Sequence, residues 1–428
     1  MNKYLFIMFS IIILFNISGY CEQPNIPTEI NANIETENKN YVYSEYIKID
    51  SRIISASNKL GFDIFAEISK NNNNVFISPV GIFMELSLIY NEASSETQKC
   101  IAETLNTKDL SLDELNMNNL ALLSTFHENN YYFGMKISNS IWKGKKSLLK
   151  ANVIENAKKY YNADIKSGYF QDKKYIDEIN YWMDIKTLHR TSKAVHEINT
   201  YSSLLILNAS IFNSTWKKVF NSNDTKIEAF NLFDGSQKQL PMMHQSGYYL
   251  YYGNKELQVV ELPYGGTTKN EVSMYIFLPA VNTNINEFNN NLNNKYIEKT
   301  IMRMDDIFGN IVIPKFKIRY RKNFNNTLKA IGMQNIFDKH NADFKNICYG
   351  ENRIWIDEIK HETCLSMDEK GTKVMAFRYR DIPEKNNGEE IPENFTMTVN
   401  RPFFVVIMNN TTKAILFMGS IVNPEEIK

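Results

Sequence analysis

The chain has 428 residues, 43% of them hydrophobic and 13% aromatic, which is enough apolar material for one large core or two ordinary ones. Its 48 basic and 48 acidic residues cancel, so the overall charge does not favour nucleic acid or an anionic membrane as a partner. Beyond the N-terminal segment the cysteines are Cys100, Cys348 and Cys364. They permit at most one bridge, which excludes a disulfide-stabilised scaffold.

The N-terminus has the pattern of a secretory signal peptide. Lys3 precedes the apolar stretch Tyr4–Ser18, and Gly19–Cys21 offers a cleavage region, so we assign the signal peptide to residues 1–21. The stretch is shorter than the roughly 20 apolar residues of a spanning helix, although an uncleaved anchor stays open because no small-x-small site is cleanly formed. We therefore expect a secreted, extracellular protein with no membrane contact once the signal is removed.

A flexible segment follows, because residues 22–45 are polar, rich in Asn and Glu, and aperiodic. Helical spacing then predicts a helix over Ile47–Lys70. After four asparagines comes a short strand, a Ser-Pro turn and a helix with almost unbroken apolar character, which indicates a buried helix. Tyr175–Leu188 has the pattern of an amphipathic helix.

Strands dominate from Leu204 onward. Apolar runs bounded by Gly, Pro or Asn lie at 204–212, 247–253, 257–265, 271–279 and 310–320. Because helices come early and strands late, the fold class is α+β with mixed, largely antiparallel sheets. No repeat or linker divides the core, so we expect a single domain over residues 46–428.

Motifs of enzymes are missing from the sequence. It has no Gly-x-Ser-x-Gly, no His-Glu-x-x-His, no phosphate-binding glycine loop and no Cys-x-x-Cys pair. The six histidines are scattered without metal-ligand spacing. We therefore predict no catalytic activity, no metal and no cofactor.

The most informative segment lies near the C-terminus. Met367–Val374 reads MDEKGTKV, a polar run continues to Asn394, and strongly apolar strands then close the chain. A long exposed loop between strands is typical of a bait or a lid rather than a simple connection.

Short motifs recur in order along nearly the whole chain. They include Asn74–Pro79, Asn208-Ala209, Trp216, Glu261–Tyr264, Pro314–Phe316, Arg401–Phe403 and Leu416–Gly419. Together they resemble the serpin family. The resemblance implies a metastable fold with a five-stranded main sheet and an exposed reactive-centre loop, here about residues 373–398. A serine protease cleaves this loop, and in inhibitory members the cut loop inserts as a new central strand and carries the acyl-bound protease with it.

The resemblance also implies roles for residues around the loop. Glu369, Gly371 and Thr372 match the hinge at which insertion begins. Lys315 and Glu369 match an ion pair at the point where the sheet opens, beside Trp216.

A second group matches polar residues beneath the centre of the sheet, and it comprises Ser78, Asn208 and His361. In the family such residues rearrange when the strands part. They are equally consistent with core polar groups that are simply hydrogen-bonded.

Several positions depart from the family pattern. Gly81 stands where a second serine is usual, and Glu92 and Ser95 replace glycines. Inhibitory serpins carry small residues after the Gly-Thr of the hinge, whereas this chain has the bulky run Lys373–Tyr379.

The hinge can be read by the period-two alternation of a strand. If Thr372 faces inward on insertion, so do Val374, Ala376, Arg378 and Arg380. Val374 and Ala376 suit a buried strand. Burying an unpaired Arg378 costs several kcal/mol, so insertion should be slow and cleavage without trapping is favoured.

The scissile bond follows from the family's spacing. Counting forward from Glu369 gives Lys385-Asn386, whereas counting backward from Pro402 gives the vicinity of Ile391. Lys385 suits a trypsin-like protease, with Arg378 and Arg380 as alternative basic sites, and a plain polar surface loop is the other interpretation.

These observations predict a monomeric serine-protease inhibitor that acts as a suicide substrate, with a serine protease as its partner. Two alternatives remain open. One is a non-inhibitory serpin that serves as a binding, transport or chaperone-like protein. The other is a decoy that proteases simply consume.

Overall fold

The computed structural model describes residues 49–126, 133–145, 147–187, 189, 195, 198, 204–265, 272–349, 354–372 and 395–427. The chain from Ile47 to Lys428 clusters into one compact unit. The predicted signal peptide and flexible segment lie outside the described residues, as does most of the predicted loop. Among the helices that are described, none is both long and apolar enough to cross a membrane.

Most of the helices precede most of the strands. The helices are α1 (Ser51–Ile68), α2 (Pro79–Glu92), α3 (Ser95–Leu105), α4 (Leu112–Phe126), α5 (Ala151–Tyr161), α6 (Lys173–Lys186), α7 (Ile285–Asn290), α8 (Asn294–Ile301) and α9 (Asn325–Leu328), with the short turns η2 (Ser222–Asp224), η3 (Lys329–Met333) and η4 (Gln334–Phe337).

The main sheet has the strand order β11-β13-β14-β5-β2-β4. Its strands are β2 (Phe133–Gly144), β4 (Ala163–Gly168), β5 (Leu204–Thr215), β11 (Phe316–Asn323), β13 (Ile359–Asp368) and β14 (Gly371–Thr372). Five of them are long, and β14 has only two residues.

The second sheet follows the order β1-β17-β16-β9-β8-β7-β10-β15, and β6 pairs with β7 outside this order. Its strands are β1 (Val75–Ile77), β6 (Lys226–Asn231), β7 (Gln237–Gly253), β8 (Leu257–Pro263), β9 (Val272–Pro279), β10 (Asp305–Pro314), β15 (Phe395–Thr398), β16 (Phe403–Asn409) and β17 (Ile415–Ile421). A small ribbon pairs β3 (Leu148–Leu149) with β12 (Cys348–Tyr349).

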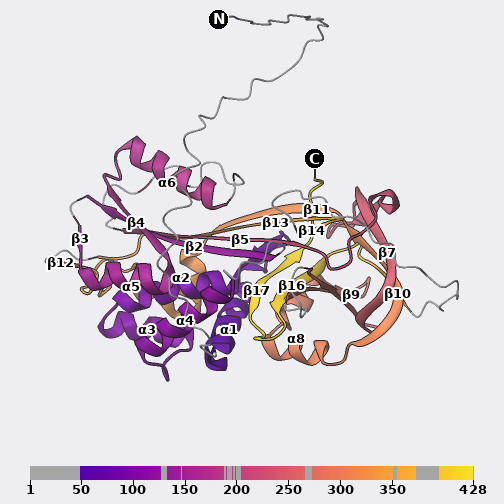
Figure 1. The fold of residues 1–428 in the computed structure, drawn as a ribbon, viewed down its shortest axis with the longest axis horizontal. Helices are drawn as coiled ribbons and strands as arrows, with labels where there is room; N and C mark the ends of the chain where they lie inside the picture. Colours follow the sequence, from indigo (N-terminus) through magenta and orange to yellow (C-terminus); the bar gives the residue numbers. More distant parts are fainter. Residues whose placement is uncertain are drawn as a thin grey trace, which may run out of the picture. The chain divides into compact units, whose positions relative to one another are not determined.

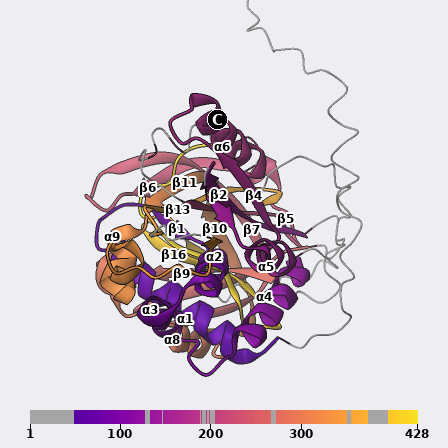
Figure 2. The same cartoon turned by 90° about the vertical axis from the view of Figure 1, so that its left-hand side faces the viewer.

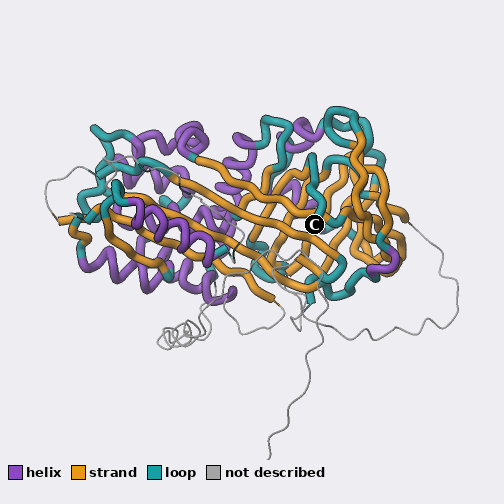
Figure 3. Tube along the Cα trace, turned by 90° about the horizontal axis from the view of Figure 1, so that it is seen from above, coloured by secondary structure: helices purple, strands orange, loops and turns teal. Residues whose placement is uncertain are grey.

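The helices and strands are segregated in space. In Figure 1, α6 lies over one face of the main sheet while α1 to α5 gather beneath the other, and Figure 2 shows the same layers from the end. Viewed from above, most helices lie on one side and the strands of the second sheet on the other (Figure 3). The α+β class predicted from the sequence is confirmed.

Helix α2 runs beneath the main sheet, and every one of its residues except Asn91 is buried. Ser78 caps its N-terminus by accepting a hydrogen bond from the Gly81 N–H, and Pro79 occupies the first turn, where its missing N–H costs nothing. The predicted buried helix is confirmed.

Helix α6 is attached to the opposite face by an apolar cluster with β2 and β5 that includes Trp142, Ile179 and Leu207. Polar contacts add to it, because Asp164 of β4 accepts the Trp182 indole N–H at 2.6 Å and pairs with Lys186 at 2.9 Å.

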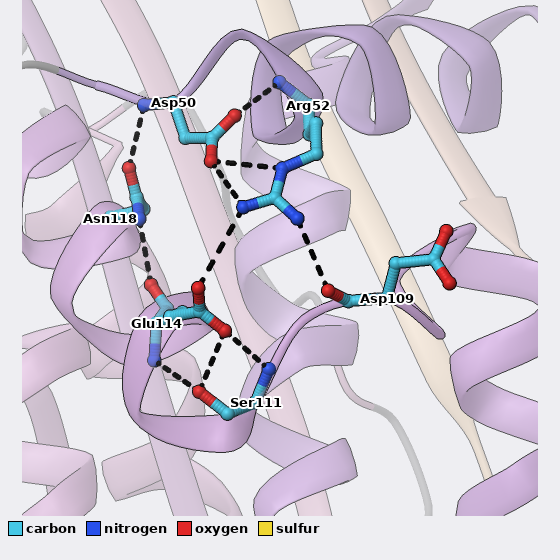
Figure 4. A network of polar contacts seen from close by, with 6 residues as sticks. All are labelled: Asp50, Arg52, Asp109, Ser111, Glu114 and Asn118. Atoms are coloured by element: carbon cyan, nitrogen blue, oxygen red, sulfur yellow. Dashed lines mark hydrogen bonds and ion pairs between the residues drawn. The ribbon is translucent and has the colours of Figure 1, made fainter.

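The start of α1 is fixed by a polar network (Figure 4). Asp50 caps the helix by accepting the Arg52 backbone N–H at 2.8 Å, and its backbone N–H donates to Asn118. The Arg52 guanidinium binds Asp50 at 2.6 Å, donates to the Asp109 carbonyl at 3.1 Å and approaches Glu114 at 3.7 Å. Exposed ion pairs of this kind contribute little energy each, but together they define where the helix begins.

Candidate functional site at the opening of the main sheet

The two central strands of the main sheet, β13 and β5, are joined at one end and separated at the other. They pair directly and in parallel from Ile359↔Ile206 to Thr363↔Ser210. Beyond that point β14 lies between them, with Thr372 opposite Met367 on one side and opposite Ser214 on the other. The chain therefore turns back after β13 and begins a new antiparallel strand inside the sheet, where an inserting loop would continue.

Gly371 is required for this turn. Its φ of +151° belongs to the region that favours glycine, and a Cβ there would lie 2.2 Å from the Ser214 carbonyl oxygen. Any side chain at this position would push β14 away from β5.

Glu369 holds the turn at the mouth of the opening. Its carboxylate accepts hydrogen bonds from the Lys315 ammonium at 2.9 and 3.2 Å and from the Thr225 hydroxyl at 3.0 Å. Its backbone carbonyl accepts the Phe220 N–H at 2.8 Å. Burial disfavours the charged form of Glu369, but the hydrogen bonds and the charge of Lys315 outweigh it, so the pKa lies below its ordinary value.

Trp216 and Tyr264 clamp β14 from the other side. Their rings stack at a centroid separation of 4.6 Å and an interplanar angle of 14°. The indole N–H donates to the Asp368 carbonyl at 2.9 Å, and the Tyr264 hydroxyl is 2.7 Å from the Thr372 hydroxyl. The first hinge residues are thus held in the sheet by contacts with three different segments of the chain.

A buried polar cluster lies beneath the sheet, where β13 and β5 still pair directly with each other. The Ser78 backbone N–H donates to His361 Nε2 at 3.1 Å, and His361 lies opposite Asn208 in the β13–β5 register. The Asn208 side chain instead binds Asn139 and Ser210, each at 2.9 Å.

His361 is fully buried, and its Nδ1 has no hydrogen-bond partner among the described residues. Burial lowers its pKa to about 3, because charging the ring inside the core is costly. The ring is therefore neutral at physiological pH.

Ser210, which sequence reasoning missed, completes this cluster at the position of Gly81. A Cβ on Gly81 would lie 2.3 Å from the Ser210 hydroxyl and 3.0 Å from Asn208 Oδ1. The Ser210 hydroxyl therefore occupies the space next to the glycine. The available signal was that Ser210 stands two residues after Asn208 in a strand and so shares its face.

Comparisons with known proteins agree with this geometry. The family model "Serpin (serine protease inhibitor)" matches residues 55–424. The chain belongs to the serpin family. This family generally inhibits serine proteases.

Individual relatives of this serpin are distant but nearly full-length. An uncharacterised serpin-like protein of Methanosarcina acetivorans is 29% identical over 87% of this chain and 86% of its own. Serpin I2 of Homo sapiens is 26% identical over 86% and 91%.

Solved structures resemble this one over most of its length. The thermophilic serpin tengpin in its native state matches with a TM-score of 0.80 and 26% identity, over 88% of this chain and 95% of that one. A thyroxine-binding globulin complex with thyroxine matches in fold with a TM-score of 0.76 and 22% identity, over 87% and 99%.

The structure thus brings together some of the serpin residues singled out from the sequence and leaves others undescribed. Lys315, Glu369 and Trp216 surround the opening, with β14 held between β13 and β5. Outside the described residues lie Val374, Ala376, Arg378, Lys385 and Asn386. No cluster of potential metal ligands occurs in the described part of the chain.

The far end of the predicted loop is a strand. Residues 395–398 form β15, which pairs in parallel with β10. Phe395 anchors it by stacking on Tyr251 at 3.8 Å.

Proposed function

We propose that this serpin is a secreted inhibitor of a trypsin-like serine protease and acts as a suicide substrate. The observation that supports this most strongly is β14, which already pairs with both β13 and β5. Because the hinge already begins inside the sheet, insertion needs only to extend an existing strand and does not have to start a new one. The costly first pairing is then made before any protease arrives.

The proposed reaction begins as ordinary proteolysis. The protease serine attacks the Lys385 carbonyl, the Lys385–Asn386 bond breaks, and the Asn386 amine leaves with a proton, so that Lys385 remains esterified to the protease. The freed segment then extends β14 between β13 and β5 and carries the protease along. Inhibition requires that this movement be faster than hydrolysis of the ester.

A protease decoy is the second candidate, and the bulky run Lys373–Tyr379 favours it. By strand alternation Arg378 would enter the sheet, at a cost of several kcal/mol for an unpaired charge. A binding role is a third possibility, consistent with the fold neighbour solved with thyroxine.

One gel experiment separates these functions. The full chain is incubated with a trypsin-like protease, run under denaturing conditions, and the C-terminal fragment is sequenced. A band at the summed mass and a fragment that begins at Asn386 support inhibition at Lys385. A cleaved chain beside active protease supports the decoy, and an uncleaved chain supports a binding role.

Two substitutions sharpen the result. Lys385→Ala should abolish complex formation with trypsin-like enzymes, and continued cleavage elsewhere would place the reactive bond at another residue. Arg378→Thr should raise the trapped fraction, whereas Lys373→Thr, the same change at an outward-facing position, should not. An equal effect of both variants would contradict the burial argument.

Secretion is a separate part of the proposal and depends on the signal peptide predicted over residues 1–21. When the full chain is expressed in a secretory host, we expect a monomer in the medium whose chain begins at residue 22. Retention of the full-length chain in membranes would favour the uncleaved anchor instead.

A further inference from the structure

The structure distinguishes among the glycosylation sequons of the chain. Within the described residues, the asparagines two positions before Ser or Thr are Asn208, Asn213, Asn223, Asn325, Asn409 and Asn410. An N-linked sugar is bulky and is attached to the side-chain amide nitrogen, so the folded protein can accommodate it only where that nitrogen lies at the surface and is not needed for a contact inside the fold.

Three of these nitrogens are already used inside the fold. Asn208 is fully buried and donates to Asn139, and Asn325 donates to the Asp357 carbonyl at 2.7 Å. Asn410 donates to the Ser273 hydroxyl at 2.9 Å and to Glu261 at 3.2 Å. A sugar at any of the three would disrupt a buried or half-buried network.

Two others are poorly placed. Asn213 is half-buried within β5, an internal strand of the main sheet. Asn409 is also half-buried, and its amide oxygen accepts the backbone N–H groups of Thr411 and Thr412, which holds the side chain against its own turn. Asn409 is the stronger rival of the two, because its side-chain nitrogen makes no hydrogen bond to a described residue.

Of these six asparagines, Asn223 is the one that combines an exposed side chain with an amide that makes no hydrogen bond to a described residue. It lies in η2, whose residues are all exposed, as is the capping residue Asn221, and its side chain makes no hydrogen bond to any described residue. Asn221 holds the turn by accepting the Asn223 backbone N–H at 3.1 Å, whereas the Asn223 side chain is exposed to solvent.

The position is next to the opening of the sheet. Asn223 stands between Phe220 and Thr225, which both donate hydrogen bonds to Glu369. We infer that Asn223 carries an N-linked oligosaccharide, which stands beside the corner where the hinge enters the sheet. This inference rests on the proposed secretion, and it does not depend on whether the serpin inhibits a protease.

The test is site-resolved mass spectrometry of the full chain expressed with its own N-terminus in eukaryotic secretory cells. Glycans are removed with peptide N-glycosidase F in ¹⁸O water, which converts each occupied Asn to labelled Asp. The expected result is label at Asn223 and its loss, with faster gel migration, in Asn223→Gln. The matched variant Asn409→Gln should keep the label at Asn223.

Two outcomes overturn the inference. One is an unlabelled Asn223 in a chain that carries sugar elsewhere. The other is a chain without any sugar, whether secreted or retained in the cell. Because the Asn223 side chain is exposed and makes no hydrogen bond to any described residue, the Gln variant should fold and unfold like the unchanged protein, and matched unfolding curves would show that the loss of label is not due to misfolding.

Discussion

Glu92, the last residue of α2, should make this serpin lose stability as the pH rises. Its carboxyl group is buried, with 3% exposure, in a small cavity lined by aliphatic side chains that include Leu88, Ile141 and Val153. Neither oxygen has a hydrogen-bond partner among the described residues. Burial raises its pKa from 4.5 to about 8, and the charge of Lys150 only partly opposes this.

The sign and size of this change in the free energy of unfolding follow from proton linkage. The folded protein holds the proton of Glu92 more tightly than the unfolded chain, so stability is lost as pH rises from about 4.5 to about 8. The shift corresponds to a loss of about 5 kcal/mol above pH 8 and about 3 kcal/mol at pH 7. Glu92→Gln removes the titration and should abolish this part of the pH dependence.

The assay is urea unfolding of both proteins from pH 5 to pH 9, followed by tryptophan fluorescence. The difference in unfolding free energy between variant and unchanged protein should grow with pH. Glu96→Gln, on the exposed surface of α3, is the matched control and should give a flat difference. A flat difference for Glu92→Gln as well would refute the reasoning.

Three further predictions concern the opening and the cluster beneath it. The pKa of His361 is about 3 in the folded protein against 6.5 in the unfolded chain, so the free energy of unfolding should fall by up to about 5 kcal/mol as the pH falls from 6.5 to 3. In urea unfolding, His361→Gln should remove this decrease at acid pH. Gly81→Ser should destabilise by about 1–3 kcal/mol through overpacking, and adding Ser210→Ala should restore at least about 1 kcal/mol in a double-mutant cycle. Gly371→Ala should displace β14, with a loss of about 2 kcal/mol and a smaller trapped fraction of protease.

Each of these has a clear contrary result. If His361→Gln left the loss of stability at acid pH unchanged, another group would be responsible for it. Additive effects of Gly81→Ser and Ser210→Ala would mean that the two side chains do not compete for space. Full activity of Gly371→Ala would mean that β14 need not be paired before cleavage.

Periodicity was sufficient to predict the fold class and the buried helix, whereas the main sheet with its exposed loop was implied by the family resemblance. The unbroken apolar character of α2 and the alternation of the late strands depend on local sequence, so the buried helix and the α+β class follow directly. The approach of Lys315 to Glu369 was expected only from the family resemblance, since nothing local joins residues so far apart in the chain.

Features set by close packing could not be predicted. The contact of Gly81 with Ser210 depends on how α2 lies under β5. The burial of Glu92 depends on a cavity shared by several segments. Ser95 has a φ of +52°, which explains why glycine is usual there, and its hydroxyl bond to Asp343 at 2.8 Å offsets part of the strain. Such facts require the three-dimensional arrangement, which one sequence does not contain.

The central claim is that the gap between β13 and β5 accepts the cleaved loop as a strand. It is tested most directly by nicking the loop with a trace of protease, purifying the nicked chain and measuring its thermal unfolding beside the intact protein. Insertion predicts that the nicked chain unfolds at a much higher temperature than the intact one. An equal or lower unfolding temperature would contradict it, because the loop would then have been cut without entering the sheet.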